Sequence, residues 1–295
     1  MAQPTPMGVA VQLTTSLESL AALAAYERIQ TEELEADPRL REILAGVAAE
    51  LLGEGRLVDD ATATSIVGYT RAFLRLAADL VENPGRSGAW NQTDEALLQG
   101  IGRGSMSVAE AIGVAESTLD GLGDRLAAPQ ATFLDVGTGT GWLAIALARA
   151  HPLMHVVGID IFEPALRLAR GNLADTGLAG RVEVRYQDVT ALEEHAAYDA
   201  IWLAIPFLPA EIVPLALTAC SRALRPGGWL LAGTFAGPDD RLSKLLVDLR
   251  TLRSGGYPWS SHELTHMLTE AGLSDAGELP RTWASPTGLY AGRRI

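Results

Sequence analysis

Hydrophobic positions follow two different periods along the chain. Up to about residue 128 they recur every three or four positions, as at Leu40, Ile43, Leu44, Val47 and Leu51, which is the spacing of an amphipathic helix. From residue 131 onward, short and largely apolar runs alternate with helical stretches, a pattern typical of parallel strands covered on both faces. The sequence therefore predicts an all-α N-terminal domain, residues 1–128, followed by an α/β domain, residues 129–295.

Turn and capping residues mark the ends of the predicted N-terminal helices. Asp37 followed by Pro38 is typical of a helix start, and the Asn-Pro-Gly turn at residues 83–85 closes a later helix. Ser107 and Glu110 have the spacing of a capping box, which predicts a further helix start at that point.

A glycine-rich run at residues 134–141, LDVGTGTG, lies between a predicted buried strand and a predicted helix. Glycines at alternate positions let the backbone turn tightly and approach a ligand closely. The dinucleotide-binding fingerprint GxGxxG would place its third glycine where this chain has Trp142. The spacing GxGxG, preceded by Asp135, suits an amino-acid-bearing nucleoside better than a pyrophosphate. It predicts a ligand at the carboxyl end of this strand.

Two further acids follow predicted strands. Asp160 ends a second buried strand 19 residues past Gly141, where a carboxylate can accept both hydroxyls of a ribose. Asp188 ends the next strand. Each acid also fits a local role, because Asp160 can cap the helix that starts near Pro164 and because Asp is favoured in turns and caps. The two interpretations are compatible.

These segments, together with residues 198–207 and the LRPGGWLL run at 224–231, resemble the class I S-adenosylmethionine-dependent methyltransferases from about residue 130 to the end. The resemblance implies a Rossmann-like seven-stranded sheet of order 3-2-1-4-5-7-6, with the seventh strand antiparallel, and S-adenosyl-L-methionine as the cofactor. The residues that it implies in cofactor binding share a place at or just after the first four strands: Asp135, Gly137, Thr138, Gly139, Gly141, Asp160, Ile161, Asp188, Val189 and Ala204. By the same resemblance, Asp188 accepts from the adenine amino group and the backbone of Val189 lies beside the ring.

The segment after the fourth predicted strand narrows the substrate. Some amino-directed methyltransferases carry N-P-P-Y or D-P-P-Y there, whereas this chain has Ala-Ile-Pro-Phe at residues 204–207. The missing polar acceptor speaks against adenine or glutamine N-methylation and favours a small, apolar or aromatic molecule, with oxygen as the preferred nucleophile and carbon next. We expect Pro206 and Phe207 to line the acceptor pocket together with Trp90 and Tyr69.

No side chain at a motif-fixed position is a convincing general base, so the catalytic residue is unknown. We expect methyl transfer by in-line displacement that depends on proximity and desolvation. The missing base leaves a second class open: a member that keeps the cofactor site without transferring methyl, as a ligand-binding or pericyclase-like protein.

Residues 1–128 are too many for a tail, and their helical stripes need a partner surface. We expect this region to form a lid over the methyl-transfer site or a homodimer interface. Residues 100–106 are too glycine-rich for an ordinary helix end, and we expect a hinge or a loop beside the cofactor there.

His262, Glu263 and His266 match the letters of the zinc-binding motif H-E-x-x-H, which makes a zinc hydrolase a remote alternative. A catalytic zinc site needs a third protein ligand and an open position. Ser260 and Glu263 form a capping box that already gives Glu263 a structural role. We therefore expect no metal.

Composition limits the partners. The net charge of −13, of which −10 lies in residues 1–128, argues against a nucleic acid, because cationic side chains supply most of the affinity for phosphates. No apolar run approaches the roughly 18 residues of a membrane span, so we expect no membrane partner. The single cysteine, Cys220, is expected to be a core thiol in a protein of the reducing cytoplasm.

Overall fold

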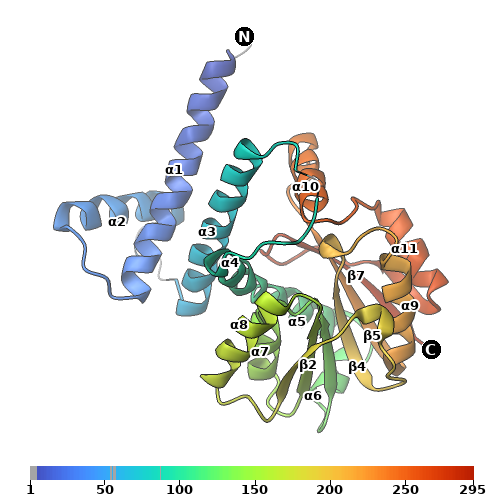
Figure 1. The fold of residues 1–295 in the computed structure, drawn as a ribbon. Helices are drawn as coiled ribbons and strands as arrows, with labels where there is room; N and C mark the ends of the chain where they lie inside the picture. Colours follow the sequence, from blue (N-terminus) through green and yellow to red (C-terminus); the bar gives the residue numbers. More distant parts are fainter. Residues whose placement is uncertain (1–4, 54, 56–57, 87) are drawn as a thin grey trace. The chain divides into compact units, whose positions relative to one another are not determined.

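The computed structural model describes residues 5–53, 55, 58–86 and 88–295. Its elements form two compact units, Met1–Glu82 and Asn83–Ile295 (Figure 1).

The first unit is helical, as predicted. It contains α1 (Pro6–Thr31), α2 (Pro38–Leu52) and α3 (Asp60–Glu82), and α1 packs against both other helices. Asp37 caps α2 by accepting from the backbone N–H groups of Arg39 and Leu40 at 2.9 and 3.3 Å, which confirms the predicted helix start.

Helix α1 is long and apolar enough to cross a membrane, by length and composition alone. It is the one such helix in the described part of the chain. Its N-terminal half leaves Met7, Val11 and Leu13 more than half exposed. The expectation that no apolar run approaches the length of a span was therefore wrong for this segment, because its charged residues, Glu18, Glu27 and Arg28, are too few to lower its overall apolarity enough.

The second unit contains the sheet, whose strands run in the order β3-β2-β1-β4-β5-β7-β6. This confirms the order that the resemblance implied. Neighbours from β3 through β5 are parallel, and β7 is antiparallel to both of its partners. The strands are β1 (Thr132–Val136), β2 (His155–Asp160), β3 (Val182–Tyr186), β4 (Tyr198–Ala204), β5 (Leu224–Phe235), β6 (Leu273–Glu278) and β7 (Thr287–Arg294).

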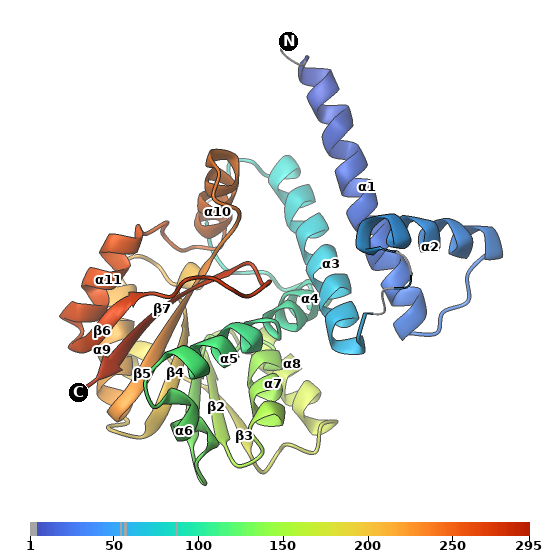
Figure 2. The ribbon, with the colours of Figure 1, turned by 180° about the vertical axis from the view of Figure 1, so that it is seen from behind.

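Helices cover both faces of the sheet (Figure 2). They are α4 (Glu95–Ser105), α5 (Val108–Thr118), α6 (Leu122–Ala127), α7 (Trp142–Ala150), α8 (Glu163–Ala174), α9 (Val213–Ala223), α10 (Arg241–Arg253) and α11 (Ser261–Glu270), with short 3₁₀ turns η1 (Val189–Ala191) and η2 (Ile205–Phe207). One core cluster unites the sheet with α5, α6 and α7, and the other unites it with α9 and α11. Cys220 of α9 lies in the second cluster, where burial raises the pKa of its thiol to about 12, so it is a core thiol as expected.

The boundary between the compact units lies at residue 82, whereas we predicted a domain boundary at residue 128. The difference arises because Ile112 of α5 and Leu122 of α6 are fully buried in the core of the sheet. The predicted capping box at Ser107 is wrong: its hydroxyl donates to the Gly104 carbonyl at 2.8 Å and caps no backbone N–H. A functional lid of residues 1–128 stays a prediction.

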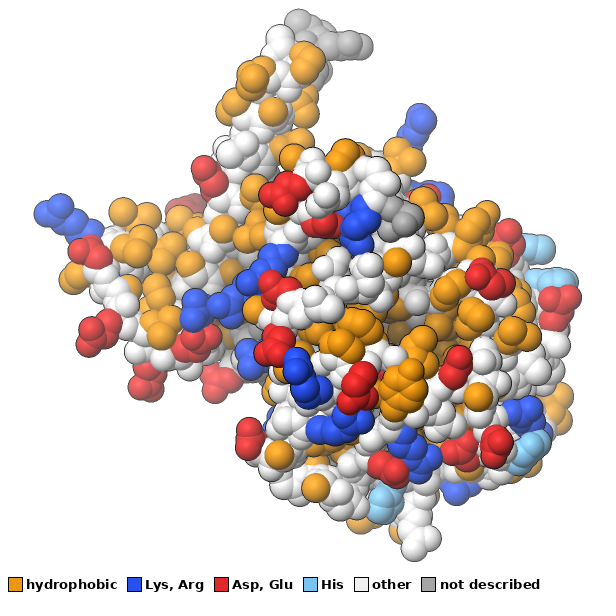
Figure 3. Space-filling model, in the orientation of Figure 1, with side chains coloured by type: hydrophobic (Ala, Val, Ile, Leu, Met, Phe, Trp, Pro, Cys, Tyr) orange, Lys and Arg blue, Asp and Glu red, His pale blue; other side chains and the backbone are white. Residues whose placement is uncertain are grey.

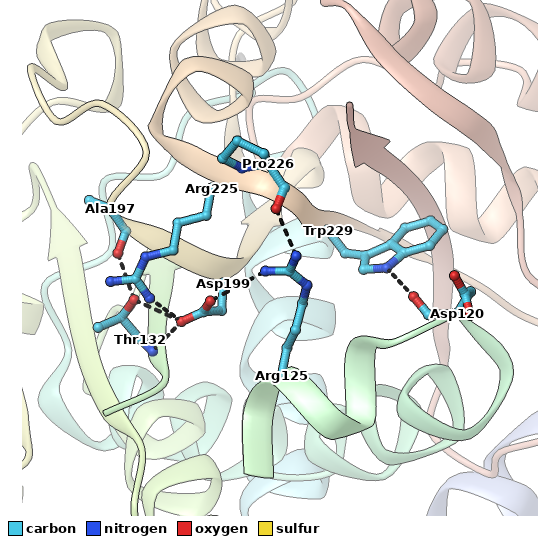
Figure 4. Close-up of polar contacts among 8 residues, drawn as sticks. All are labelled: Asp120, Arg125, Thr132, Ala197, Asp199, Arg225, Pro226 and Trp229. Atoms are coloured by element: carbon cyan, nitrogen blue, oxygen red, sulfur yellow. Dashed lines mark hydrogen bonds and ion pairs between the residues drawn. The ribbon is translucent and has the colours of Figure 1, made fainter. Parts of the chain in front are cut away.

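A polar cluster joins α6 to the amino-terminal ends of the central strands (Figure 4). Asp199 of β4 is buried and accepts from the backbone N–H of Thr132 at 2.9 Å and from the guanidinium of Arg225. Arg125 of α6 pairs with the same carboxylate at 3.6 Å and donates to the carbonyl of Pro226 at 2.7 Å. Asp199 therefore joins three strands and a helix at the end of the sheet opposite the predicted ligand site.

We expect Asp199→Ala to lower the free energy of unfolding by about 2 to 3 kcal/mol, because it leaves two arginines and a backbone N–H without their shared acceptor. Urea denaturation measures this loss. The matched control is Asp120→Ala, which breaks an exposed pair with Arg293 and should cost less than about 1 kcal/mol. Equal losses in the two variants would contradict a special role for Asp199.

Candidate functional site

The loop between β1 and α7 has a backbone conformation that requires glycine. Gly137, Gly139 and Gly141 have φ values of 76°, 56° and 78°, in the left-handed region that other residues rarely adopt. A Cβ at Gly137 or Gly139 would meet nothing nearer than 3.7 Å, so conformation rather than space requires glycine at these two positions. The loop therefore leaves room in which a ligand can approach its backbone.

Asp160 at the end of β2 is tied directly to this loop. Its Oδ2 accepts from the backbone N–H of Gly139 at 2.8 Å, and its Oδ1 accepts from the N–H of Phe162 at 2.9 Å. Burial raises the pKa of Asp160, while these backbone donors oppose the rise. Each carboxylate oxygen has a second lone pair, which suits it to accept from a ribose hydroxyl.

Asp135 lies inside the protein, beneath the loop. It is 1% exposed, and its Oδ2 accepts from the hydroxyl of Thr138 at 2.7 Å. Burial raises the pKa of Asp135 to about 7; the Thr138 hydrogen bond opposes this rise, and the nearby charge of Asp160 adds to it. Two carboxylates and an open glycine backbone fit a nucleoside that carries a positively charged group.

The remaining predicted cofactor residues lie along the same edge of the sheet. Asp188 follows β3 and accepts from the backbone N–H and hydroxyl of Thr190 at 2.8 Å, so its local capping role is confirmed. Ile161 is 60% exposed directly after Asp160, and Val189 is buried. Ala204 ends β4, and its Cβ lies 3.7 Å from where a Cβ on Gly137 would stand. The structure thus brings together the carboxyl ends of β3, β2, β1 and β4, while the binding roles of these residues stay predictions.

Aromatic side chains form a cluster beyond the ends of β4 and β5. The rings of Trp90 and Phe207 lie 4.9 Å apart and nearly perpendicular, and those of Phe207 and Phe235 lie 5.7 Å apart in the same manner. Pro206 is buried beside Phe207. Phe235 was not predicted as a pocket residue, although its place at the end of β5 was a usable signal. Tyr69 belongs to the other unit, so its pocket role stays a prediction.

The histidine pair of α11 has a structural surrounding. Ser260 and Glu263 make the reciprocal capping box, as predicted. The rings of His262 and His266 are 6.4 Å apart, and Nδ1 of His266 lies 3.3 Å from a carboxylate oxygen of Glu270, on an exposed surface. Within the described residues, no group of three or more side chains gathers that could hold a metal ion.

Comparison with known proteins identifies the family. The family described as "Methyltransferase domain" matches residues 133–228. A ubiquinone biosynthesis O-methyltransferase of Thiobacillus denitrificans is 30% identical over 173 residues, which cover 53% of this chain and 70% of that protein. The chain belongs to the class I S-adenosylmethionine-dependent methyltransferases. An O-methyltransferase family protein from Burkholderia thailandensis shares the fold, with a TM-score of 0.65 and 17% identity over 99% of both chains.

Other relatives match over a smaller share of their length. Aclacinomycin 10-hydroxylase RdmB of Streptomyces purpurascens is 36% identical over 161 residues, which cover 52% of this chain and 42% of that protein. A release factor glutamine methyltransferase of Rhodopirellula baltica is matched over 44% of its length. The chain thus spans less than half of these relatives.

We expect Asp160→Ala to weaken binding of S-adenosylhomocysteine by about 1.5 to 3 kcal/mol for each ribose hydrogen bond lost, since a charged acceptor is removed. Calorimetric titration measures the dissociation constant. Asp160→Asn keeps one side-chain oxygen as an acceptor and should show a smaller loss. An unchanged dissociation constant in the alanine variant would sink the assignment.

We expect the raised pKa of Asp135 to make stability fall as pH rises from about 4 to 7. Over this window the folded protein holds a proton that the unfolded chain, with an ordinary Asp pKa near 3.9, has released. The contribution is therefore present below the unfolded pKa and lost as pH rises through the folded one. Urea denaturation at pH 5 and pH 8 tests this, and Asp135→Asn should show a smaller drop between the two. Identical pH dependence in both proteins would disprove it.

Proposed function

We propose that this methyltransferase transfers a methyl group from S-adenosylmethionine to an oxygen of a small, apolar or aromatic acceptor. The aromatic cluster of Trp90, Phe207 and Phe235 carries this proposal, because its partly exposed rings stand at the strand ends beside the glycine loop. Rings at near-perpendicular angles present both faces and edges to a flat molecule. The relative from Thiobacillus denitrificans is named a ubiquinone biosynthesis O-methyltransferase, which agrees with an oxygen nucleophile.

S-Adenosylmethionine supplies a methyl group made electrophilic by its bond to a sulfonium. The protein's part is to align the acceptor oxygen and keep water away from it. The aromatic rings suit this task because they exclude water and hold a planar molecule by contact rather than by hydrogen bonds. Asp160 places negative charge on the cofactor side, and Asp135, whose pKa burial raises to about 7, adds to it above that pH. This charge favours a cationic ligand there.

The chemistry after β4 argues for oxygen over nitrogen. Ala204 ends the strand, and Pro206 and Phe207 follow in η2, where amino-directed relatives carry a polar acceptor. A target amine would find no Asn or Asp side chain at this position to accept its hydrogen. We therefore propose that this protein does not methylate a glutamine, unlike the Rhodopirellula relative, which is named a release factor glutamine methyltransferase.

A second function is a cofactor-retaining member that does not transfer methyl. The relative named aclacinomycin 10-hydroxylase favours it, because the name describes a different reaction. Release of S-adenosylhomocysteine on incubation with phenolic acceptors discriminates the two: release supports methyl transfer, and tight cofactor binding without release for any acceptor supports the second function.

The proposal extends to where the protein is located and how it assembles. We place the protein in the cytoplasm, where its buried single thiol needs no oxidising environment. We propose a homodimer in which the helical region of residues 1–128 acts as lid or interface, and we propose no nucleic-acid partner. The leucines of α10 support self-association, because Leu242, Leu245 and Leu252 are at least half exposed. Figure 3 shows further hydrophobic side chains, in orange, at the surface of the face that it draws.

We expect Trp90→Ala to raise KM for the acceptor about tenfold or more, since an aromatic partner in a stacked pocket contributes roughly 1 to 3 kcal/mol. The dissociation constant of S-adenosylhomocysteine should stay within a factor of two. Trp283→Phe, far from the cluster in sequence and buried beside β7, is the control for loss of an indole. An acceptor KM equal to that of the unaltered protein would remove Trp90 from the pocket.

A further inference from the structure

Three elements meet behind the glycine loop through two side-chain amides. Gln99 lies on α4, Asn172 lies on α8, and Trp142 is the first residue of α7. The indole N–H of Trp142 donates to Oε1 of Gln99 at 2.7 Å, and Nε2 of Gln99 donates to Oδ1 of Asn172 at 2.8 Å. Nδ2 of Asn172 donates to Oε1 of Gln99 at 3.1 Å and to the carbonyl of Thr140 at 2.9 Å.

The two ends of this network fix the orientation of both amides. An indole N–H can only donate, so Gln99 must present its oxygen to Trp142. A backbone carbonyl can only accept, so Asn172 must present its nitrogen to Thr140. Neither amide can flip without facing donor against donor or acceptor against acceptor. The network therefore has one arrangement, in which the Thr140 carbonyl is held at a set position.

Helix α4 also touches the loop through its backbone. A Cβ on Gly102 would lie 1.8 Å from Oγ1 of Thr140 and 3.0 Å from Cδ1 of Trp142. The guanidinium of Arg103 lies over the Trp142 ring, 5.4 Å from its centroid. The glycine-rich stretch that we expected to be a hinge or loop is thus helical, and its glycine permits close packing of α4 on the loop.

The second half of the loop is consequently held on three sides. Asp160 holds the N–H of Gly139, Asn172 holds the carbonyl of Thr140, and Gln99 holds the side chain of Trp142. A loop with glycine at alternate positions has much conformational freedom to lose on binding a ligand, and fixing it beforehand lowers that cost.

We propose that Gln99 and Asn172 are positioning residues that preorganise the glycine loop for the cofactor. They act through Trp142 and Thr140 and do not themselves need to touch the ligand. The inference rests on the proposed function in one respect, that this loop binds S-adenosylmethionine.

The test uses isosteric variants of the full chain titrated with S-adenosylhomocysteine. Gln99→Glu replaces the Nε2 donor by an oxygen that faces Oδ1 of Asn172, and Asn172→Asp places a carboxylate oxygen against the Thr140 carbonyl. We expect each to raise the dissociation constant about tenfold, as loss of a partly buried hydrogen bond does. Gln99→Met keeps the side-chain length without charge and should show a similar rise.

The matched control is Glu95→Gln. Glu95 of α4 bridges to Arg167 of α8 at 2.6 Å, so it joins the same two helices without contacting the loop. We expect its dissociation constant to stay within a factor of two of the unaltered protein. Urea unfolding midpoints, measured without ligand, separate the roles: a purely structural bridge would lower the midpoint and leave affinity unchanged.

Two results would overturn the inference. One is that the variants of Gln99 and Asn172, including Gln99→Met, bind S-adenosylhomocysteine with the same dissociation constant as the unaltered protein. The other is an equal loss of affinity in Glu95→Gln. An unaltered protein that does not bind S-adenosylhomocysteine would overturn the proposed function together with this inference, whereas normal binding with unchanged variants overturns the inference alone.

Discussion

Three left-handed residues within five positions are the constraint around which the Asn83–Ile295 unit is arranged. A segment of this kind has little conformational preference of its own, because glycine loses more backbone entropy on folding than any other residue. Its stability must come from neighbours. The unit supplies them from β2 through Asp160, from α8 through Asn172 and from α4 through Gln99.

The electrostatics of the site follow from the same arrangement. Asp135 is buried beneath the loop and Asp160 is tied to its backbone, so two acids share a small and largely buried region. Such a pair is unfavourable in the unliganded protein and becomes favourable when a cation lies above it. At the other end of the sheet, Asp199 lies between two arginines and stabilises the fold. Burial of a carboxylate thus stabilises the fold at one end of the sheet, and at the other end it occurs in the predicted cofactor site.

Periodicity and local motifs were enough to predict much of this. The strand that ends in Asp160 and the loop glycines could be placed from the sequence because both are local patterns, and the sheet order came from the family resemblance. The partners Gln99 and Asn172 could not be found in this way, because 73 positions separate them and neither stands in a recognisable motif. The unit boundary was missed for a related reason: a helical period shows that α5 is amphipathic but not which surface covers its apolar face. Ser107 shows that the residue types and spacing of a capping box do not ensure the capping hydrogen bond, because its hydroxyl donates to the Gly104 carbonyl instead.

The contact between Gly102 and Thr140 has a consequence for sequence change over evolutionary time. Thr140 is 3% exposed, and a methyl group at position 102 would occupy the space of its hydroxyl. Alanine or serine at position 102 therefore requires the side chain at position 140 to shift or to be smaller, whereas a smaller residue at 140 leaves glycine at 102 undisturbed. Although the two residues are 38 positions apart in the chain, we expect a larger residue at position 102 to occur in relatives only together with a change at position 140, because the two side chains share one tightly packed space.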